Sequence, residues 1–295
     1  MLPYWVEFFD ELQNVRGRAL NTIMAYRRDL EVYEGFVRIH KKDVERIYDF
    51  LSNRNLSVRS QARVISSVRT YLRFCSRQGM KVPQMRQLRL PKVRVGLPKT
   101  ITVREFEKLY NACQVNDAYS TARNQVTLLL LFGVGCRVSE LIALDVSDFS
   151  VTDGWLKILG KGNKERLVPL TKFLQDELES YLRKAQPKLS RRKLRSIIIN
   201  DRGNRPSRVD IWRWLQAWSK AAGFARSISP HKLRHGCATA LLEGGADLRS
   251  IQVLLGHSSI QTTKIYTSVT RKKIREDMDK HNPLSGMRID SDVDV

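Results

Sequence analysis

Five side chains suited to phosphate chemistry form a distinct pattern along the chain. His231 lies three residues before Arg234, His257 lies nine residues before Tyr266, and Arg137 follows an apolar run far upstream. Cleavage of a phosphodiester without a metal ion needs cations for the charge on the non-bridging oxygens, a nucleophile, and a proton donor for the departing alkoxide. The pattern therefore indicates a phosphodiester-cleaving site.

Each type of side chain has a defined task in such a site. The phenol of Tyr266 is a nucleophile once its proton, with an ordinary pKa of about 10, is removed. Arg137 and Arg234 stay charged, and their planar guanidinium groups match two phosphate oxygens at once. Because Arg137 lies between apolar segments, we expect it to be buried near the core beside an anionic partner, and Glu140 is one helical turn away.

His231 and Arg234 share one face of a predicted helix. Ser229 and Pro230 mark its N-terminus as cap and first residue. Residues i and i+3 meet on a helix surface, so both side chains can contact one phosphate near amide groups that favour an anion. His235 points elsewhere on this helix, and we expect it to be structural.

A glycine-rich turn carries the candidate proton donor. Strands at 155–159 and 166–170 are joined by residues 160–164 (GKGNK), which predicts a β-hairpin. Lys161 at its tip can protonate a leaving alkoxide, with Lys164 as the alternative. The segment lacks the GxxxxGK[ST] order and the strand-to-helix setting of a phosphate-binding P-loop.

The overall charge favours a polyanionic partner. The chain has 295 residues, 42% of them hydrophobic, which is enough for two domains with buried cores. Lys and Arg number 52 against 30 Asp and Glu, a net charge of +22. Nucleic acid is the leading partner, ahead of anionic lipid or a merely solvated basic surface.

Cysteine usage and apolar runs indicate the compartment. The four cysteines occur singly, without the spacing of a disulfide framework or a zinc site, so we expect no metal. Residues 1–10 lack the features of a signal peptide, and the longest apolar run, at 126–136, falls short of the roughly 20 residues that span a bilayer. We therefore expect a cytoplasmic protein without a membrane partner.

The chain divides into four segments. Residues 81–99 are basic and contain three prolines, which predicts an extended linker. A capping-box pattern at Thr102 opens a second domain, 100–284, and 285–295 form an acidic, flexible tail. Residues 1–80 form the first domain, with helices predicted at 4–15, 20–39, 44–51 and 57–77.

The second domain is mainly helical, with a strongly apolar helix at 118–133 in its core. In its last predicted helix, Ile274 and Met278 share one face. Two apolar residues are too few to stabilise the helix in isolation. We therefore expect this helix to dock into a pocket. The other helices are predicted at 102–115, 171–185, 208–222, 230–243, 248–255, 260–269 and 270–281.

Basic residues outside the candidate site are candidates for DNA contact. The helix at 57–77 carries arginines between its apolar positions, and the linker carries no acidic residue. A solvated basic face is the alternative. The predicted contacts are Arg59, Arg63, Arg69, Arg73, Lys92, Arg94 and Lys164.

Three segments resemble the tyrosine recombinase (lambda-integrase) family, and within it the Xer-type recombinases that resolve chromosome dimers. They are residues 135–141 (GCRVSEL), 231–235 (HKLRH) and 254–258 (LLGHS). The resemblance has motif strength from about 129 to 267 and holds in outline over the N-terminal helices. Gly236 departs from it, because the family more often has a larger residue there, and we expect this glycine to weaken its helix by about 1 kcal/mol or less.

The resemblance implies a role for each candidate residue. Tyr266 is the nucleophile, His231 is the general base that assists it, and Lys161 is the general acid. His257 bonds the scissile phosphate, and Glu140 orients the first arginine. The implied reaction leaves a 3′-phosphotyrosine and a free 5′-hydroxyl and needs neither ATP, a metal nor another cofactor.

The implied architecture is mainly α with a small β hairpin or sheet. It is a two-domain, C-shaped DNA clamp, with a helical core-binding (SAM-like) domain and a catalytic domain. Four protomers, identical or of two kinds, act on two recombination sites in duplex DNA of the nucleoid. The resemblance suggests that helix 270–281 docks on the neighbouring protomer as an exchanged tail, and packing on its own domain is the alternative.

Three other functions fit parts of the pattern. They are an integrase of a mobile element, a type IB topoisomerase that relaxes DNA, and a non-catalytic DNA-binding protein with this fold. The presence of all six candidate catalytic residues disfavours the last. The sequence does not reveal the DNA target, because base preference depends on side-chain placement. It also leaves open whether a related recombinase or a DNA translocase takes part.

Overall fold

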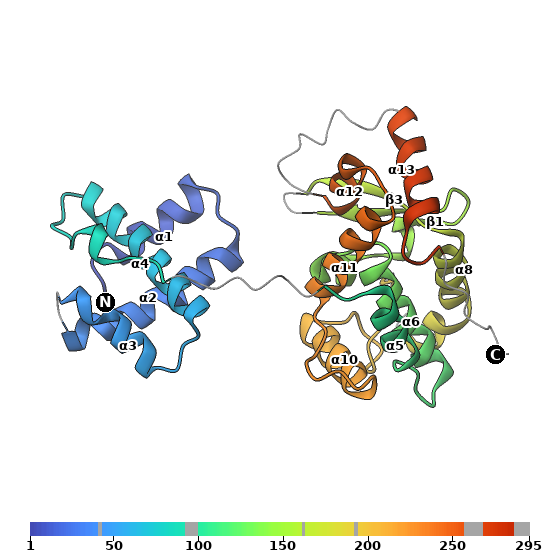
Figure 1. Cartoon of the computed structure of the whole chain (residues 1–295), viewed down its shortest axis with the longest axis horizontal. Coiled ribbons are helices and arrows are strands. Elements are labelled where there is room, and N and C mark those ends of the chain that lie inside the picture. Colours follow the sequence, from blue (N-terminus) through green and yellow to red (C-terminus); the bar gives the residue numbers. More distant parts are fainter. Residues whose placement is uncertain (41–42, 92–99, 161–162, 192–193, 257–267, 286–295) are drawn as a thin grey trace. The chain divides into compact units, whose positions relative to one another are not determined.

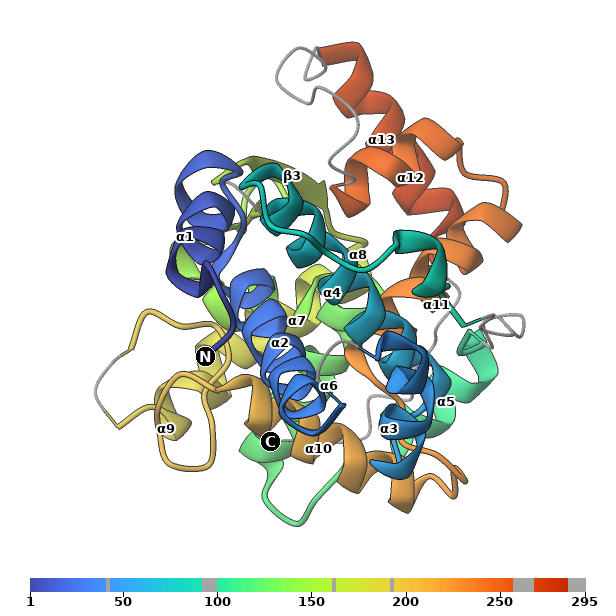
Figure 2. The same cartoon turned by 90° about the vertical axis from the view of Figure 1, so that its left-hand side faces the viewer.

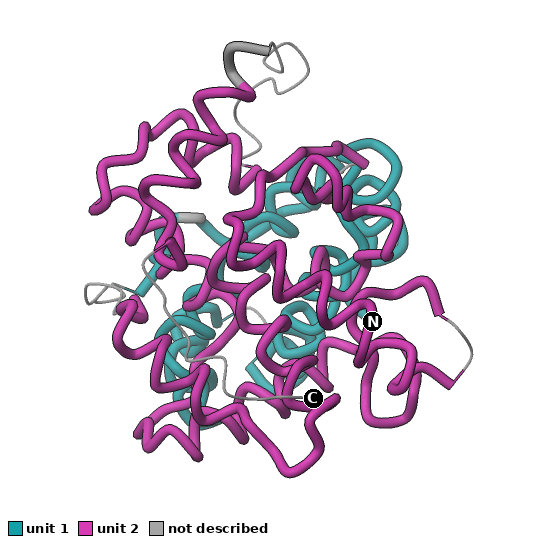
Figure 3. Tube along the Cα trace, turned by 90° about the vertical axis from the view of Figure 1, so that its right-hand side faces the viewer, with its two compact units in different colours: residues 1–98 teal, residues 99–295 magenta. Residues whose placement is uncertain are grey.

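The computed structural model describes residues 1–40, 43–91, 100–160, 163–191, 194–256 and 268–285. The chain forms two compact units, Met1–Pro98 and Lys99–Val295, which Figure 3 shows in separate colours. The described residues are mostly helical, with one three-stranded sheet in the second unit. The predicted mainly α fold with a small sheet is confirmed.

The first unit is a helical bundle around an aromatic and aliphatic core. Phe36, Ile65 and Val68 are completely buried there because apolar residues recur at helical spacing along α2 and α4. These two helices pack against each other, and both can be followed in Figure 2. The helices are α1 (Trp5–Asp10, continued by a π-helical turn, Glu11–Val15), α2 (Leu20–His40), α3 (Ile47–Asn53) and α4 (Val58–Arg77).

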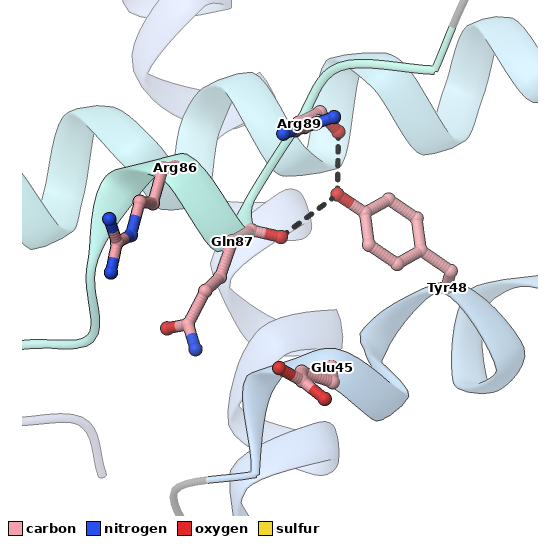
Figure 4. A pocket seen from close by; sticks show the side chains of 5 residues that line it. All are labelled: Glu45, Tyr48, Arg86, Gln87 and Arg89. Atoms are coloured by element: carbon pink, nitrogen blue, oxygen red, sulfur yellow. Dashed lines mark hydrogen bonds between the residues drawn. The ribbon is translucent and has the colours of Figure 1, made fainter.

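Part of the predicted linker packs on the first unit. Leu88 is completely buried in its core, and Met85–Gln87 form a short 3₁₀ helix. The hydroxyl of Tyr48 donates to the carbonyl oxygens of Arg89 (2.6 Å) and Gln87 (3.3 Å), as Figure 4 shows. The sequence predicted an extended segment here. Residues 85–89 are instead held on the first unit by the burial of Leu88 and by the hydrogen bonds of the Tyr48 hydroxyl. Residues 92–99 lie outside the described part of the chain.

The second unit is built around α6 (Ala118–Phe132), whose last five residues are completely buried. Thr102 caps the helix before it with the predicted capping box, because its hydroxyl accepts from the Glu105 amide. The remaining helices are α5 (Val103–Asn111), α7 (Val138–Ala143), α8 (Lys172–Ser180), α9 (Gln186–Leu189), α10 (Arg208–Ala221), α11 (Pro230–Glu243), α12 (Leu248–Leu255) and α13 (Ser268–His281).

The sheet extends the predicted hairpin by one short strand. Its strands are β1 (Phe149–Ser150), β2 (Trp155–Leu159) and β3 (Glu165–Pro169), antiparallel in the order β1-β2-β3. Trp155 pairs with Pro169, and Leu159 pairs with Glu165. At two residues, β1 is too short to produce a visible alternation in the sequence. Helices α12 and α13 pack next to β3, as Figure 1 shows.

Helix α13 packs on its own unit. Ile274 and Met278 are each only 1% exposed in the second core. Arg275 fastens the helix to the sheet, because its guanidinium donates to the Leu170 carbonyl (2.9 Å) and stacks over the Trp155 ring at 4.8 Å. Within the single chain, Ile274 and Met278 therefore pack in a pocket that their own unit forms.

Gly236 and Gly35 make a matched pair for a stability test. A Cβ atom on Gly236 would lie 2.7 Å from the backbone oxygen of Ile101, whereas one on Gly35 would meet only Phe50, at 3.8 Å. Gly236→Ala should therefore destabilise the protein by about 1 to 3 kcal/mol through overpacking. Gly35→Ala should stabilise it by about 0.4 to 1 kcal/mol. Denaturant unfolding of the full chain measures both. A stabilised Gly236→Ala would show that this helix does not need the close approach.

Candidate active site

Three arginines converge on one buried carboxylate, that of Glu140 in α7. Arg137 donates to it twice, from its backbone amide (2.8 Å) and from Nη1 (2.7 Å). Arg166 of β3 forms a bidentate pair with the same carboxylate, at 3.0 and 2.7 Å. Arg234 of α11 approaches it to 4.0 Å. Residues from three elements are thus gathered around a single anion.

The same three arginines cap the C-terminal end of α12. The carbonyl oxygens of the last helical turn have no partners within the helix, and cations are favoured at this end. Arg166 donates to the Leu254 carbonyl at 2.8 Å, and Arg234 donates to the Leu255 carbonyl. Arg137 completes the series at Gly256 O, at 3.1 Å. Three consecutive carbonyl groups each accept from a different arginine.

Two glycines in the left-handed backbone region make this arrangement possible. Gly256 ends α12 with φ +63°, and a Cβ there would lie 3.2 Å from Arg166 Nη1. Gly135, with φ +67°, turns the chain after α6, and its carbonyl oxygen accepts from Arg234 Nη1. A side chain at either position would be strained. At Gly256 it would crowd Arg166, and at Gly135 it would lie 2.6 Å from the Leu255 side chain.

The cluster carries a net positive charge. Burial by itself raises the pKa of the Glu140 carboxyl, but the hydrogen bonds and charges of Arg166 and Arg137 outweigh burial and hold that pKa below its ordinary value. Burial, together with the charge of Arg137, lowers the pKa of Arg234 to about 10, so this guanidinium remains charged at neutral pH. Three cations around one anion leave an excess of two positive charges, which suits a phosphate.

Arg137 is less buried than the sequence suggested. Its side chain is 40% exposed, whereas the side chains of Arg234 and Glu140 are 8% and 3% exposed. Arg137 has the expected anionic partner, but full burial was wrong, because this residue is the N-cap of α7: Nη1 meets Glu140, Nη2 meets the Gly256 carbonyl, and the side chain is otherwise partly exposed. The exposed part remains available to a ligand.

His231 lies at the start of α11, as the sequence predicted. Ser229 caps this helix by accepting from the amide of Lys232, and Pro230 is its first residue. The side chains of His231 and His235 are both exposed; His231 lies about one turn before the buried Arg234, and His235 directly follows it. Lys164 is exposed next to the hairpin turn. Lys161, His257, Tyr266, Lys92 and Arg94 lie outside the described residues.

Sequence reasoning did not assign a role to Arg166. This side chain is only 4% exposed and lies on the same face of β3 as the buried Val168. An arginine at an inward strand position requires an anionic partner. That alternation was the signal by which Arg166 could have been found.

The predicted DNA contacts on α4 differ in their surroundings. Arg59 and Arg73 are exposed, and Arg69 is half-buried. Arg63 is also exposed, at 54% of its side chain, and it pairs at 2.7 Å with Asp29, which is 1% exposed. Burial raises the pKa of Asp29, although a hydrogen bond from Ser67 and the charge of Arg63 oppose this. Arg63 is therefore engaged in neutralising a buried acid within the first unit.

A second arginine cluster lines a cavity of about 300 Å³ in the first unit. Glu11 pairs with Arg16 at 2.6 Å and with Arg77 at 2.7 Å. Arg18 and Arg73 add two more cations to its wall. Four guanidinium groups and one carboxylate give this cavity an excess of positive charge that suits a phosphate. The sequence alone did not bring these residues together, because they come from two separate segments, 11–18 and 73–77.

Neither a metal cluster nor a membrane span is found in the described part of the chain. No group of three or more His, Cys, Asp or Glu residues there has the proximity needed to hold a metal ion. No described helix is both long and apolar enough to cross a membrane.

Comparison with known proteins defines the family. Residues 99–273 match the phage integrase family, and residues 6–79 match the N-terminal SAM-like domain of phage integrases. Tyrosine recombinase XerD of Listeria monocytogenes serotype 4b (strain F2365) is 37% identical over 281 residues, which cover 91% of this chain and 94% of that protein. The chain therefore belongs to the phage integrase family. It is a tyrosine recombinase, an enzyme of site-specific DNA recombination, as the sequence predicted.

Solved structures support the same fold. The XerH site-specific recombinase bound to a palindromic difH substrate has a TM-score of 0.68 at 23% identity, covering 90% of this chain and 81% of that one. A lambda integrase tetramer bound to a Holliday junction has a TM-score of 0.66 at 21% identity, covering 86% and 76%. At these identities the likeness concerns the fold alone.

Loss of the shared anion should be costly and pH-dependent. Glu140→Gln leaves buried arginines without their carboxylate, so the free energy of unfolding at neutral pH should fall by about 3 to 5 kcal/mol. Because the folded-state pKa of Glu140 is lowered, its contribution is complete above the ordinary value of 4.5 and disappears as the pH falls through the lower folded value. The stability difference between wild type and variant should therefore shrink as the pH falls below 4.5. Denaturant unfolding at several pH values measures this difference.

Glu177 in α8 provides a control of opposite sign. Burial raises the pKa of its carboxyl, so ionisation of Glu177 costs stability as the pH rises through that raised value. Glu177→Gln should gain stability relative to wild type over that range. If both variants changed in the same direction with pH, the lowered pKa of Glu140 would be refuted.

Proposed function

We propose that the second unit cuts and rejoins DNA strands through Tyr266. In this mechanism His231 takes the phenolic proton, and the phenolate oxygen attacks phosphorus. The bond from phosphorus to the 5′-oxygen breaks, and Lys161 protonates the departing oxygen. The phosphate remains as a 3′-phosphotyrosine, so the bond energy is kept for the reverse attack by a 5′-hydroxyl from a partner duplex.

The arginine cluster is the observation that carries this proposal. Arg137 and Arg234 would hold the non-bridging oxygens, with His257 donating a further hydrogen bond. Their excess positive charge would attract an anion. Both arginines also contact Leu255 or Gly256, the last described residues before 257–267, the segment that contains His257 and Tyr266. Preorganised cations of this kind stabilise charge that develops in the transition state.

The first unit is proposed to hold the duplex against the second. Its arginine-lined cavity and the exposed Arg59 offer contacts for backbone phosphates. Lys92 and Arg94 would continue these contacts along the linker, and Lys164 would add one beside the hairpin. In this proposal residues 1–80 are the core-binding domain, 81–99 the linker, 100–284 the catalytic domain and 285–295 a flexible tail. The two domains would close as a C-shaped clamp.

The cellular role is proposed to be chromosome dimer resolution before cell division. The similarity to a relative named XerD over nearly the whole chain supports this role over integration of a mobile element. Four protomers would act on two sites, as four protomers of lambda integrase do on a Holliday junction. The protein would work in the cytoplasm, on DNA of the nucleoid. Sequencing the DNA that is covalently bound in the native cell tests this role, because mobile-element ends would contradict it.

Plasmid relaxation separates this proposal from a type IB topoisomerase. A recombinase should exchange strands between two short duplexes that carry its site. A topoisomerase would relax any supercoiled plasmid as a monomer. Relaxation without site preference, in the absence of strand exchange, would reject the recombinase mechanism.

Tyr266→Phe should bind DNA but form no covalent adduct. The ring and its packing remain, while the attacking oxygen is lost. The measurement is adduct formation on a nicked substrate that traps the intermediate, with DNA affinity measured in parallel. Adduct formation by the variant at wild-type yield would transfer the nucleophile to another residue.

Lys161→Ala should be rescued by a better leaving group. The variant should cleave a normal phosphodiester slowly, by about 10² to 10⁴-fold, because the leaving oxygen lacks its proton donor. A 5′-bridging phosphorothiolate should restore cleavage, since a thiolate departs without a proton. Lys164→Ala is the matched control and should cleave both substrates alike. Selective rescue of Lys164→Ala instead would reassign the acid.

A further inference from the structure

Arg166 is the most completely used cation in the cluster. All three of its guanidinium nitrogens donate hydrogen bonds: two to Glu140, at 3.0 and 2.7 Å, and one to the Leu254 carbonyl, at 2.8 Å. With a side chain that is 4% exposed, it has no edge left for a phosphate. It therefore differs from Arg137, whose guanidinium is partly exposed, although both contact the same carboxylate.

The position of Arg166 links three parts of the site. It starts from β3, one strand of the hairpin, and reaches both α7 and the end of α12. Gly256 and Gly160 flank its guanidinium, and added Cβ atoms there would lie 3.2 and 3.7 Å from Nη1. A single planar group thus sets the spacing between the hairpin, the carboxylate and the last turn before residue 257.

The charge of Arg166 determines how strongly Glu140 attracts the two other arginines, Arg137 and Arg234. A buried carboxylate that lost this bidentate partner would turn its full charge on Arg137 and Arg234. Arg137 already donates to this carboxylate, and without Arg166 both guanidinium groups would have more of their charge offset by Glu140 and less left for a ligand. With Arg166 in place, its positive charge offsets the negative charge of Glu140. The positive charges of Arg137 and Arg234 are then left to attract a ligand.

We propose that Arg166 is a positioning residue for catalysis: it occupies Glu140 so that Arg137 and Arg234 remain available to the scissile phosphate, and it ties β3 to the end of α12. This proposal rests on the proposed function, in which the scissile phosphate binds at Arg137 and Arg234. Arg166 itself touches neither the phosphate nor the nucleophile. A purely structural role would be met as well by an apolar side chain of similar length, since buried ion pairs can often be replaced in that way.

The test is single-turnover cleavage at saturating DNA by full-length variants. Arg166→Met keeps length and loses charge, and its cleavage rate should fall by on the order of 10 to 100-fold, less than for loss of a direct donor. Arg166→Lys keeps the charge without the planar fork and should recover part of that loss. Because the proposed effect passes through Glu140, Arg166→Met should cost much less in a Glu140→Gln background than in wild type.

Arg123 in α6 provides the control for stability. Its side chain is also 4% exposed and paired, with Asp201, and its guanidinium lies 4.2 Å above the Trp214 ring. Arg123→Met should lose thermal stability and keep the wild-type cleavage rate at saturating DNA. Equal rate losses in Arg123→Met and Arg166→Met, or no rescue by Arg166→Lys, would overturn the positioning role. The Lys variant keeps the test decisive if the Met variant is poorly folded.

Failure of the wider mechanism would look different. An adduct formed by Tyr266→Phe would reject the proposed nucleophile, yet the rates of Arg166 variants would still be measurable in chains that retain Tyr266. Conversely, a wild-type rate in Arg166→Met would reject the positioning role while leaving the nucleophile assignment intact.

Discussion

The sharing of Glu140 and the α12 carbonyl groups by three guanidinium ions is the constraint on which the candidate site depends. Helix ends leave carbonyl oxygens without partners, and arginines need anionic company when buried. Both requirements are met together here, since Arg137, Arg166 and Arg234 each donate to one of three consecutive carbonyl oxygens. The excess positive charge left over is what suits the cluster to the phosphate of the proposed mechanism.

The same electrostatic device occurs in the first unit with a different outcome. Glu11 holds Arg16 and Arg77 beside an open cavity, so cations remain available there. Asp29 is buried, and Arg63 pairs with it although the Arg63 side chain is 54% exposed. The surroundings of an arginine therefore depend on where its carboxylate lies, and not only on its position along a basic helix face.

Much of the secondary structure could be predicted from local patterns. Apolar spacing located α2, α4 and α6, and the capping box at Thr102 located the start of α5, because these signals act within a few residues. The short β1 was missed since two residues show no period, and the docking of Leu88 was missed since proline content reports local stiffness, not the presence of a distant pocket.

By itself, the sequence determined the chemistry that this chain can perform: the types and spacing of Arg137, His231, Arg234 and Tyr266 indicated phosphodiester exchange before any fold was known. Only the tertiary structure decided how charge is distributed among these groups. Arg166 contacts Glu140, 26 positions away, and the end of α12, 88 positions away. The partial exposure of Arg137 likewise depends on how these distant segments pack. Such contacts arise from packing over long sequence separations, which residue spacing along one segment does not encode.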